Sequence, residues 1–445
     1  MKENESGLKE RIANGLNSSL RILDTGRVLV KNGAGLLLGS LTGKDPAIYT
    51  ALRKSFEELG ATYIKLGQLI ASAPGLFPKE LVDEMQKCLD SAAPIPFSDV
   101  EKILKTEFKN KHKQVFASIE ETPIASASIA QVHGAKLANG TDVVIKVQRP
   151  GISNRLEADL NMLYLAALVF EKFAPGGSRA GLTGIVQEFH RTIIEETDFY
   201  QEARHLEDFE AFLSKANEKG VMVPKVYHHA STGRVLTMER LYGVSLTDLG
   251  AIRKISKNPR ETLTLALNTW FQSLMFCGFF HADVHAGNLM VLNDGRVAFI
   301  DFGIVGKMKT EIWEALMGLV SAMGSQDYEL MAKSLVGMNA TNEEVNIPQF
   351  ARELETVFNE MEQFTNDIQH KSELDEQQIN KMMMDLVNIS QSNGLKIPRE
   401  FALLFKQLLY FDRYIQILAP DMNITEAQPL SLESGHKALR ARNKK

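Results

Sequence analysis

The sequence is poor in several features that mark particular classes of protein. It has two cysteines among 445 residues, Cys88 and Cys277, so it has no disulfide framework, and neither has the spacing of a metal ligand. Its net charge of -5 gives no overall basic field for nucleic acid. It lacks a run of the roughly 20 apolar residues that span a bilayer, and its polar start, Met1–Ser19, is no secretory signal. These absences favour a cytoplasmic protein without a nucleic-acid partner.

One segment leaves room for a peripheral membrane contact. Val28–Leu41 is apolar, but it is too short to span a bilayer and contains Lys31 and Asn32. It could lie in a membrane interface or pack as a helix on the rest of the protein. The chain itself is long enough for more than one hydrophobic core, or for one large domain with two lobes.

The segment from Asp283 to Gly303 has the pattern of a phosphoryl-transfer site. Asp283 is followed five positions later by Asn288. Two short segments come next, 289–292 and 297–300, and an Asn-Asp-Gly turn joins them into a hairpin. The hairpin leads into Asp301, the first residue of an Asp-Phe-Gly triplet. The triplet alone arises by chance, but the whole order is a specific signal. A polar loop in a helical protein is the alternative interpretation.

The chemistry of these residue types suggests their roles. In kinases, an aspartate at the first position orients or deprotonates the attacking hydroxyl. The asparagine and the second aspartate are oxygen ligands for the Mg²⁺ that bridges the nucleotide phosphates. We therefore expect Asp283 to be catalytic, Asn288 and Asp301 to bind Mg²⁺, and ATP or ADP to be the nucleotide.

Residues 115–150 have a different character and predict a small sheet. Strands are expected over 115–119, 129–137 and 142–148, with a tight turn at Asn139-Gly140 between the last two. The third strand carries Lys146 among apolar neighbours, at the position that in kinases contacts the nucleotide phosphates. A lysine on a solvated strand face is the alternative. Between the first two strands, where kinases have a glycine-rich loop over the phosphates, lie Ala125, Ser126, Ala127 and Ser128.

The sheet needs partners from later in the chain. A long helix over about 182–217 carries the acidic residues Glu195, Glu196, Asp198 and Glu202. Since an unpaired buried ammonium is costly, one of these acids must neutralise Lys146 if the kinase interpretation holds. Strands over 223–227 and 234–238 complete the sheet. The segment after them, with Glu239 and Leu241, is expected to be the hinge whose backbone contacts an adenine.

Elsewhere, apolar residues recur every three or four positions and predict helices. The expected helices are one from Pro46 past Gln68, then 79–89, one from Asp99 capped by Ser98, 156–173, 261–277, 310–323, 327–337, 348–368, 374–392 and 398–418.

These motifs, in this order, resemble the UbiB/AarF/ADCK family of atypical, protein-kinase-like proteins over about residues 45–420. The matching segments are Lys65-Leu66-Gly67-Gln68 (the family's KxGQ motif), Ala125–Ser128 (its alanine-rich loop), 131–133 and 144–151 (its nucleotide-lobe strands), Glu196-Thr197-Asp198 (its ExD motif) and His281–Asn288 (its HxDxHPGN motif). One departure is Ala286, where the family usually has proline. Since that proline only stiffens a turn, the change is not expected to abolish binding.

The resemblance implies further roles. Glu202 would pair with Lys146, which would hold the α and β phosphates. Lys65 and Gln68 would lie on a helical extension packed over the active site, with Lys65 near Glu196 or Asp198, and would close the site to peptides. Family members support quinone and other isoprenoid-lipid pathways at membranes, so an isoprenoid lipid or lipid-biosynthesis proteins are expected partners.

Together these features predict an α+β, bilobal protein-kinase-like fold. The expected parts are an N-terminal helical extension over 1–110, a small antiparallel-sheet N-lobe over 111–242 with inserted helices, a helical C-lobe over 243–430, and a basic, disordered tail over 431–445.

Two classes of function fit the motifs. One is an ATP-dependent enzyme, either a kinase or an ATPase, because no residue essential to Mg-nucleotide chemistry is missing. The other is a nucleotide-dependent scaffold for a lipid-biosynthesis complex that does not turn over. An ordinary protein kinase is a weaker interpretation, because no Ala-Pro-Glu end of an activation segment follows Gly303. Aminoglycoside-type phosphotransferases share the layout but do not account for Lys65-Leu66-Gly67-Gln68.

Overall fold

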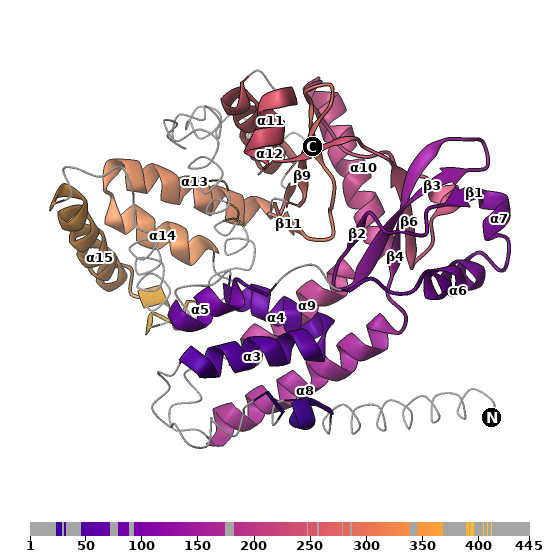
Figure 1. The fold of residues 1–445 in the computed structure, drawn as a ribbon. Coiled ribbons are helices and arrows are strands. Elements are labelled where there is room, and N and C mark those ends of the chain that lie inside the picture. Colours follow the sequence, from indigo (N-terminus) through magenta and orange to yellow (C-terminus); the bar gives the residue numbers. More distant parts are fainter. Residues whose placement is uncertain are drawn as a thin grey trace, which may run out of the picture. The chain divides into compact units, whose positions relative to one another are not determined.

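The chain folds into two compact units, and each unit is built from two separate segments of the sequence. A computed structural model describes residues 24–28, 31–32, 46–71, 79–88, 93–173, 182–246, 248–255, 258–277, 279–284, 287–338, 345–367, 389–390, 392–395, 404, 407 and 411. The first unit comprises Met1–Arg204 and Lys225–Arg240, and the second comprises His205–Pro224 and Leu241–Lys445 (Figure 1). Most of the expected interfacial segment 28–41, most of the helices expected over 374–392 and 398–418, and the tail lie outside the described residues.

The first unit contains an antiparallel sheet built from four predicted strands and one short strand that was not predicted. Its strands are β1 (Phe116–Ile119), β2 (Ala125–Ser126), β3 (Ala130–Leu137), β4 (Asp142–Gln148) and β6 (Val235–Glu239), in the order β1-β3-β4-β6 with β2 beside β3. Along β4, Val143, Ile145 and Val147 are fully buried in a core shared with α6 (Phe97–Glu107). Because side chains alternate along a strand, Lys146 lies on the opposite face.

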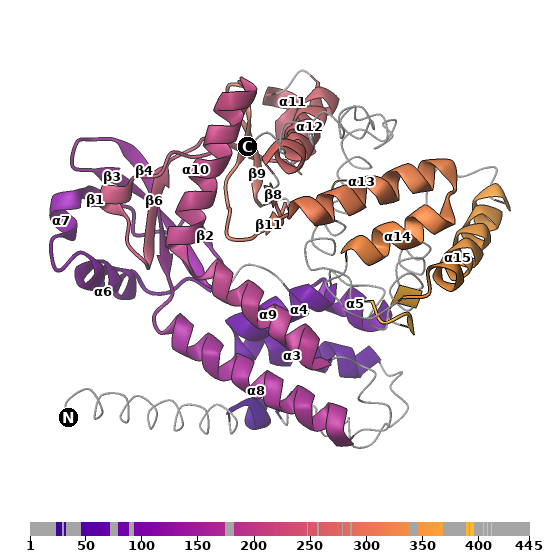
Figure 2. The same ribbon diagram turned by 180° about the vertical axis from the view of Figure 1, so that it is seen from behind.

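The other elements of the first unit are helices. They are α3 (Pro46–Leu59), α4 (Ala61–Ala71), α5 (Lys79–Met85), α7 (His112–Val115), α8 (Ile152–Phe173), α9 (Leu182–Glu196), the short 3₁₀ helix η3 (His228–Ala230) and α10 (Phe199–Ala216), which continues into the second unit. Figures 1 and 2 show α3, α4, α8 and α9 side by side. A buried hydrogen bond from Thr62 Oγ1 to Asp159 Oδ2 (2.6 Å) ties α4 to α8.

Three predictions for this unit were wrong in detail, the first two because a local backbone signal overrides apolar spacing. The helix from Pro46 breaks at Gly60, whose φ of +94° is left-handed. The expected helix over 182–217 is two helices, because Asp198 caps α10 by accepting from the backbone N–H of Tyr200 and Gln201. The helix expected from Asp99 with Ser98 as its cap already begins at Phe97.

The second unit contains the other two sheets and the later helices. Its strands are β5 (Val221–Met222), β7 (Gly243–Ser245), β9 (Leu289–Leu292) and β10 (Val297–Phe299), in the order β5-β10-β9-β7, and a separate pair, β8 (Phe279–His281) and β11 (Val305–Lys307). Its helices are α11 (Leu249–Ile255), α12 (Pro259–Cys277), α13 (Thr310–Ser325), α14 (Tyr328–Met338) and α15 (Ile347–Asp367). The hairpin prediction is confirmed by β9 and β10.

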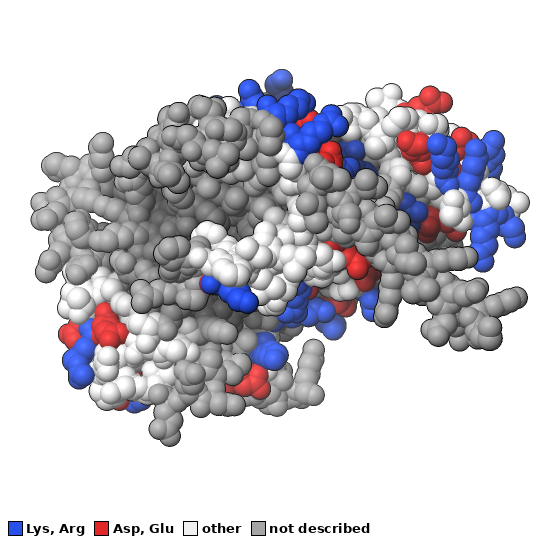
Figure 3. Space-filling view, turned by 90° about the horizontal axis from the view of Figure 1, so that it is seen from below, with Lys and Arg blue, Asp and Glu red and all other residues white. Residues whose placement is uncertain are grey.

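One strand was assigned to the wrong sheet. The segment 223–227 was expected to join the first sheet, but it makes only an isolated bridge between Val226 and Met238. The strand at this point, β5, lies two residues earlier and pairs in parallel with β10 of the second unit. No helix in the described part of the chain is long and apolar enough to cross a membrane. On the face drawn in Figure 3, the described Lys and Arg residues lie among Asp and Glu residues.

An ion-paired carboxylate on α5 makes part of the stability of the first unit dependent on pH. Arg53 Nε lies 2.8 Å from Glu84 Oε1, and this hydrogen bond, with a second from Lys87, lowers the pKa of the Glu84 carboxyl to about 2. A carboxyl pKa that is lower in the folded than in the unfolded chain stabilises the fold above the unfolded pKa of about 4.3. That contribution is lost as the pH falls towards 2.

We therefore expect Glu84→Gln to lower the free energy of unfolding by about 1 kcal/mol at pH 7. The difference from the unsubstituted protein should shrink between pH 4.5 and pH 2, as urea unfolding at a series of pH values would measure. Glu80→Gln, on the exposed side of the same helix, is the matched control. Its difference in free energy of unfolding from the unsubstituted protein should not change over this pH range. A constant Glu84→Gln difference down to pH 2 would contradict this origin of the stability.

Candidate functional site

A buried ion pair connects the central strand of the first sheet to α10. Lys146 on β4 lies opposite Val132 on β3 and Leu236 on β6. Its Nζ is 2.7 Å from Oε1 and 2.9 Å from Oε2 of Glu202, and the Glu202 side chain is 1% exposed. The ammonium also lies 5.4 Å from the ring centre of Phe199. The structure thus brings together Lys146 and the acid that the family resemblance assigned to it.

The small-residue segment before β3 is held by side-chain hydrogen bonds. Ala125 and Ser126 form the short strand β2 rather than a loop, and Ala127 is exposed. Ser126 Oγ accepts a hydrogen bond from Arg149 Nη2 at 2.9 Å, and Arg149 Nε donates to the Ala127 carbonyl at 2.9 Å. Ser128 is 2% exposed and lines a pocket of the first unit. One arginine therefore fixes the backbone of this segment.

The motif Lys65–Gln68 lies on α4 and contacts the end of α9. Lys65 Nζ is 3.0 Å from Glu196 Oε2, whereas Asp198, the other expected partner, caps α10. Gln68 lies on the same side of α4, nearly one turn further along. Gly67 has a packing role, because a Cβ there would meet Cys88 Sγ at 3.0 Å. Burial raises the pKa of the Cys88 thiol to about 11, so this thiol is protonated at neutral pH and inert.

The two expected hinge residues flank the boundary between the units. Glu239 ends β6 opposite Val143, and its backbone N–H donates to the Lys225 carbonyl at 2.8 Å. Its carboxylate accepts from Lys225 N at 3.3 Å. Leu241 follows outside the strand and begins the next segment of the second unit.

In the second unit, Asp283 and Asn288 are joined through the backbone of their loop. The Asn288 Nδ2 amide donates to the Asp283 carbonyl at 2.8 Å, and the Asp283 N–H donates to His281 Nδ1 at 3.1 Å. His285 and Ala286 lie outside the described residues. These two bonds use backbone atoms of Asp283, so they fix the position of its main chain in the loop.

Asp301 is placed beside Asn288 by the hairpin. The Ile300 N–H donates to the Asn288 carbonyl at 3.1 Å, and Asp301 Oδ1 accepts from Gly303 N at 3.0 Å. The Phe302 ring packs 4.6 Å from the His281 ring. The second unit therefore gathers Asp283, Asn288 and Asp301 at the ends of β8, β9 and β10.

The donor set fits a nucleotide-bound Mg²⁺ better than a metal held by protein alone. Asn288 Nδ2 is used in the loop, whereas its Oδ1 has no hydrogen bond to the described residues and can act as a ligand. Among the described residues, no group of three or more His, Cys, Asp or Glu side chains could hold a metal ion. Mg²⁺ commonly uses one or two carboxylates and completes its shell with phosphates and water.

Three further residues support this loop, and two of them, Gln407 and His205, were not singled out from the sequence. Gln407, fully buried, accepts a hydrogen bond from Val284 N at 2.7 Å and donates to the Ala282 carbonyl at 2.8 Å. Trp270 Nε1 donates to the His281 carbonyl at 2.8 Å, and His205 Nδ1 contacts the Phe302 carbonyl at 3.1 Å. For Gln407 a signal existed, since it lies on the apolar stripe of the helix expected over 398–418, between Leu404 and Phe411.

Comparison with known proteins places these residues in a wider context. Residues 87–335 match the ABC1 atypical kinase-like domain, a range that includes every candidate residue except Lys65 and Gln68. The chain is 47% identical over 403 residues to an uncharacterized aarF domain-containing protein kinase, chloroplastic, from Arabidopsis thaliana, covering 87% of this chain and 75% of that protein. It is 37% identical over 388 residues to an uncharacterized protein from Mycobacterium tuberculosis, covering 86% and 78%.

Two further matches extend this similarity. Protein ACTIVITY OF BC1 COMPLEX KINASE 7, chloroplastic, from Arabidopsis thaliana is 31% identical over 421 residues, which cover 93% of this chain and 59% of that protein. The Mycobacterium tuberculosis protein in the solved Rv3197–erythromycin complex matches with a TM-score of 0.50 and 23% identity over 94% of each chain. Identity that low shows the fold alone. This structural match and the match to the ABC1 atypical kinase-like domain, together with the antiparallel sheet and the helical regions described above, confirm the α+β, kinase-like fold class.

Proposed function

Since this chain belongs to the ABC1 family of atypical kinase-like proteins, the UbiB family, we propose that it is a Mg-nucleotide-dependent phosphotransferase or ATPase. Its substrate would come from isoprenoid-quinone or related lipid metabolism at a membrane surface. A kinase-like domain implies nucleotide binding in general, and the residues described above support the more specific roles.

The observation that carries the proposal is the buried pair of Lys146 and Glu202. Removing both charges from water costs several kcal/mol, so such a pair is a poor choice for stability alone. A phosphate-binding lysine, in contrast, needs a carboxylate that fixes its ammonium and keeps it charged. Lys146 is 14% exposed and Glu202 is 1% exposed, so the lysine is the more accessible partner for a nucleotide phosphate.

The second unit supports the chemical step. Asp283 lies in a loop whose backbone is fixed by hydrogen bonds to His281 and from Asn288, which suits a carboxylate that orients or deprotonates an acceptor hydroxyl. Asn288 Oδ1 and the Asp301 carboxylate would hold Mg²⁺, which supplies positive charge to the phosphates when bound.

The extension supports a restriction on substrates. The Lys65–Glu196 ion pair, together with the Thr62–Asp159 hydrogen bond, fastens α4 to α8 and α9. We assign Lys65, Gln68, Glu196 and Asp198 to the control of access rather than to the reaction. The alanine-rich segment agrees with this role, because its Cβ atoms restrict how closely the backbone can approach a phosphate.

A stripe of exposed apolar side chains supports the membrane part of the proposal. It lies on the second half of α8 and consists of Leu165, Leu168, Val169, Phe170 and Phe173. Contiguous exposed apolar surface of this kind is unfavourable in water and typical of sites that contact another protein or a membrane.

Nucleotide affinity of a Lys146 variant tests the proposal. We expect Lys146→Met to weaken Mg-ATP binding about 10- to 100-fold, the value of one hydrogen bond to a charged group. Isothermal titration would measure it, with Lys136→Met on β3 as an exposed-lysine control that binds normally. Because Lys146→Met removes the ammonium that pairs with the buried Glu202 carboxylate, the double variant Lys146→Met/Glu202→Gln should be titrated as well. Normal affinity in both folded variants would refute the assignment.

A further inference from the structure

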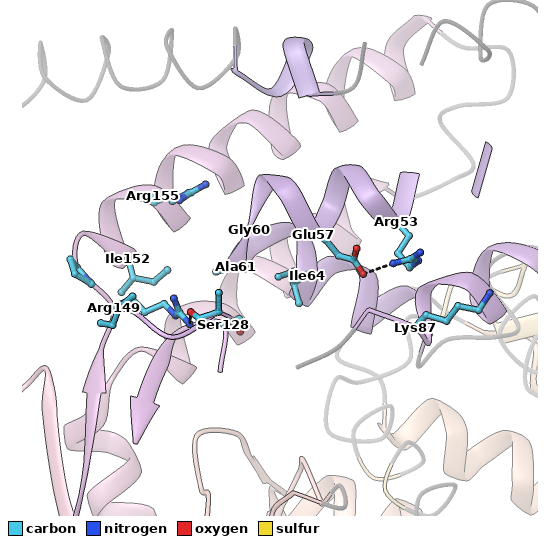
Figure 4. Close-up of a pocket in the computed structure, with 13 residues that line it drawn as sticks. Arg53, Glu57, Gly60, Ala61, Ile64, Lys87, Ser128, Arg149, Ile152 and Arg155 are labelled. Atoms are coloured by element: carbon cyan, nitrogen blue, oxygen red, sulfur yellow. Dashed lines mark hydrogen bonds and ion pairs between the residues drawn. The ribbon is translucent and has the colours of Figure 1, made fainter. Parts of the chain in front are cut away.

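The first unit contains a pocket of about 650 Å³ that the proposed reaction does not use. Its walls come from α3, α4 and the start of α8, together with the turn before β3 and the segment that follows β4 (Figure 4). Lys146 does not line it. A volume of this size is in the range of pockets that hold small organic molecules.

The basic residues at the two ends of the pocket differ in whether carboxylates neutralise them. Figure 4 shows Arg53 and Lys87 at one end and Arg149 and Ser128 at the other. Arg53 and Lys87 already have carboxylate partners, because Arg53 bonds to Glu57 and Glu84, and Lys87 also bonds to Glu84. Arg149, in contrast, has no carboxylate partner among the described residues. The excess positive charge therefore lies at the Arg149 end.

Arg149 is held in place with two donors to spare. Its Nε donates to the Ala127 carbonyl, and its Nη2 donates to the Ala93 carbonyl and to Ser126 Oγ, all at 2.9 Å. These bonds fix the plane of the guanidinium. The two N–H groups of Nη1 make no hydrogen bond to the described residues. Burial lowers the pKa of the guanidinium, so its charge is partly desolvated, and a nearby anion would offset that cost.

Ser128 provides the second, independent observation. Its side chain is 2% exposed, it lines the same pocket, and its Oγ has no hydrogen-bond partner among the described residues. A buried hydroxyl without a partner is destabilising, so such a group is unusual unless a ligand or water completes its hydrogen bonds. A hydroxyl beside a fixed guanidinium is a donor set for an anion.

We propose that this pocket binds a phosphate group, either of a soluble phosphate or pyrophosphate ester or of an anionic lipid headgroup. Ser128 Oγ and Arg149 Nη1 donate to its oxygens. The three donors suit the several oxygens of a phosphate, and Ala61, Ile64 and Ile152 offer apolar surface to the group that carries it.

The position of the pocket gives the ligand a consequence. One wall belongs to α4, where Ile64 directly precedes Lys65, and the alanine-rich segment contributes to the lining through Ser128. A bound phosphate would therefore tie the helical extension to the segment expected to cover the nucleotide. This site goes beyond the proposed function, and its occupancy does not require nucleotide turnover.

The test is direct titration of the full chain with inorganic pyrophosphate in EDTA, without Mg²⁺ or nucleotide, and in parallel with vesicles of phosphatidylcholine alone or with phosphatidic acid. We expect Ser128→Ala to weaken binding about 5- to 10-fold, the loss of one hydrogen bond, and Arg149→Gln to weaken it further. Ser128→Ala removes an unpartnered hydroxyl, so the melting temperature should not fall. Ser118→Ala on β1 is the exposed control.

The possible outcomes support or overturn phosphate binding in this pocket as follows. Binding of pyrophosphate that Ser128→Ala weakens and Lys146→Met leaves intact supports a soluble phosphate ligand. Binding only to phosphatidic acid vesicles, weakened by Ser128→Ala, supports a lipid headgroup. The proposal is overturned if neither probe binds. It is also overturned if Ser128→Ala and Arg149→Gln both bind as tightly as the unsubstituted protein. Binding lost in Lys146→Met but not in Ser128→Ala also overturns it, because the anion then occupies the nucleotide site.

Discussion

Replacement of Asp283 by asparagine should lower the turnover of Mg-ATP by about a thousandfold, the middle of the range for removal of a general base. Asparagine has nearly the same shape as aspartate but neither its charge nor its ability to accept a proton. The loop should survive the change, because the hydrogen bonds to His281 Nδ1 and from Asn288 Nδ2 use the backbone of residue 283. The expected loss is therefore one of chemistry and not of folding.

The measurement is Mg-ATP hydrolysis by the purified protein, with and without liposomes and a phenolic isoprenoid mimic. Asp294→Asn is the matched control, since Asp294 is an exposed turn residue of the hairpin whose carboxylate pairs with Arg296. Turnover that lipid stimulates and that only Asp283→Asn abolishes would support both parts of the proposed function. If lipid does not stimulate turnover, that result would count against the lipid part of the proposed function alone.

Two other results would favour different functions. Equal turnover by Asp283→Asn and the unsubstituted protein would mean that Asp283 is not the base. Nucleotide binding without turnover in any of these mixtures would favour the nucleotide-dependent scaffold. Since Lys146→Met reports on affinity and Asp283→Asn on turnover, the two variants separate binding from chemistry.

The parts of the fold that could be predicted from the sequence are those set by neighbouring residues. The boundaries of β4 and of the β9–β10 hairpin follow from alternation and from turn residues, and both predictions are confirmed. The family resemblance implied the Lys146–Glu202 contact, whereas the residues alone indicated only that one acid of the helix expected over 182–217 would pair with the lysine.

Where the prediction failed, a competing interaction decided the structure. Asp198 reads as one more acid of a long helix, but its carboxylate satisfies two backbone N–H groups and starts a new helix instead. Val221–Met222 could have joined either sheet by its composition, and only the pairing with Val297–Ala298, about 75 residues away, fixes the choice. Such contacts leave no periodic trace in the sequence.

Gln407 is the clearest case of a distant contact. Its side chain accepts from Val284 N and donates to the Ala282 carbonyl, so it satisfies both backbone groups that flank Asp283. It lies more than 120 positions from that loop in the sequence, and its only local mark is a polar residue on a buried helix stripe with Leu404 and Phe411. Phe411 packs edge-on against Trp270 at 5.1 Å, and Trp270 in turn bonds to the His281 carbonyl.

Replacement of Gln407 by leucine should therefore lower the free energy of unfolding by about 2–4 kcal/mol, because it leaves a buried N–H and a buried carbonyl without partners. The volume of the side chain changes little, so the loss reports on hydrogen bonding and not on a cavity. The midpoint of urea unfolding, followed by tryptophan fluorescence, measures it. Gln349→Leu is the matched control, since Gln349 is exposed on α15. Its free energy of unfolding should change by less than about 0.5 kcal/mol.

The same variant should also lose activity while it is folded. With Gln407 gone, the peptide units on either side of Asp283 are free to turn, and a carboxylate misplaced by about 1 Å can cost on the order of a hundredfold in rate. At a temperature where Gln407→Leu is fully folded, turnover should fall while the affinity for Mg-ATP, which the Lys146 side chain is expected to supply in part, changes less. An unchanged unfolding midpoint would show that solvent satisfies these backbone groups and that Gln407 is not what positions Asp283.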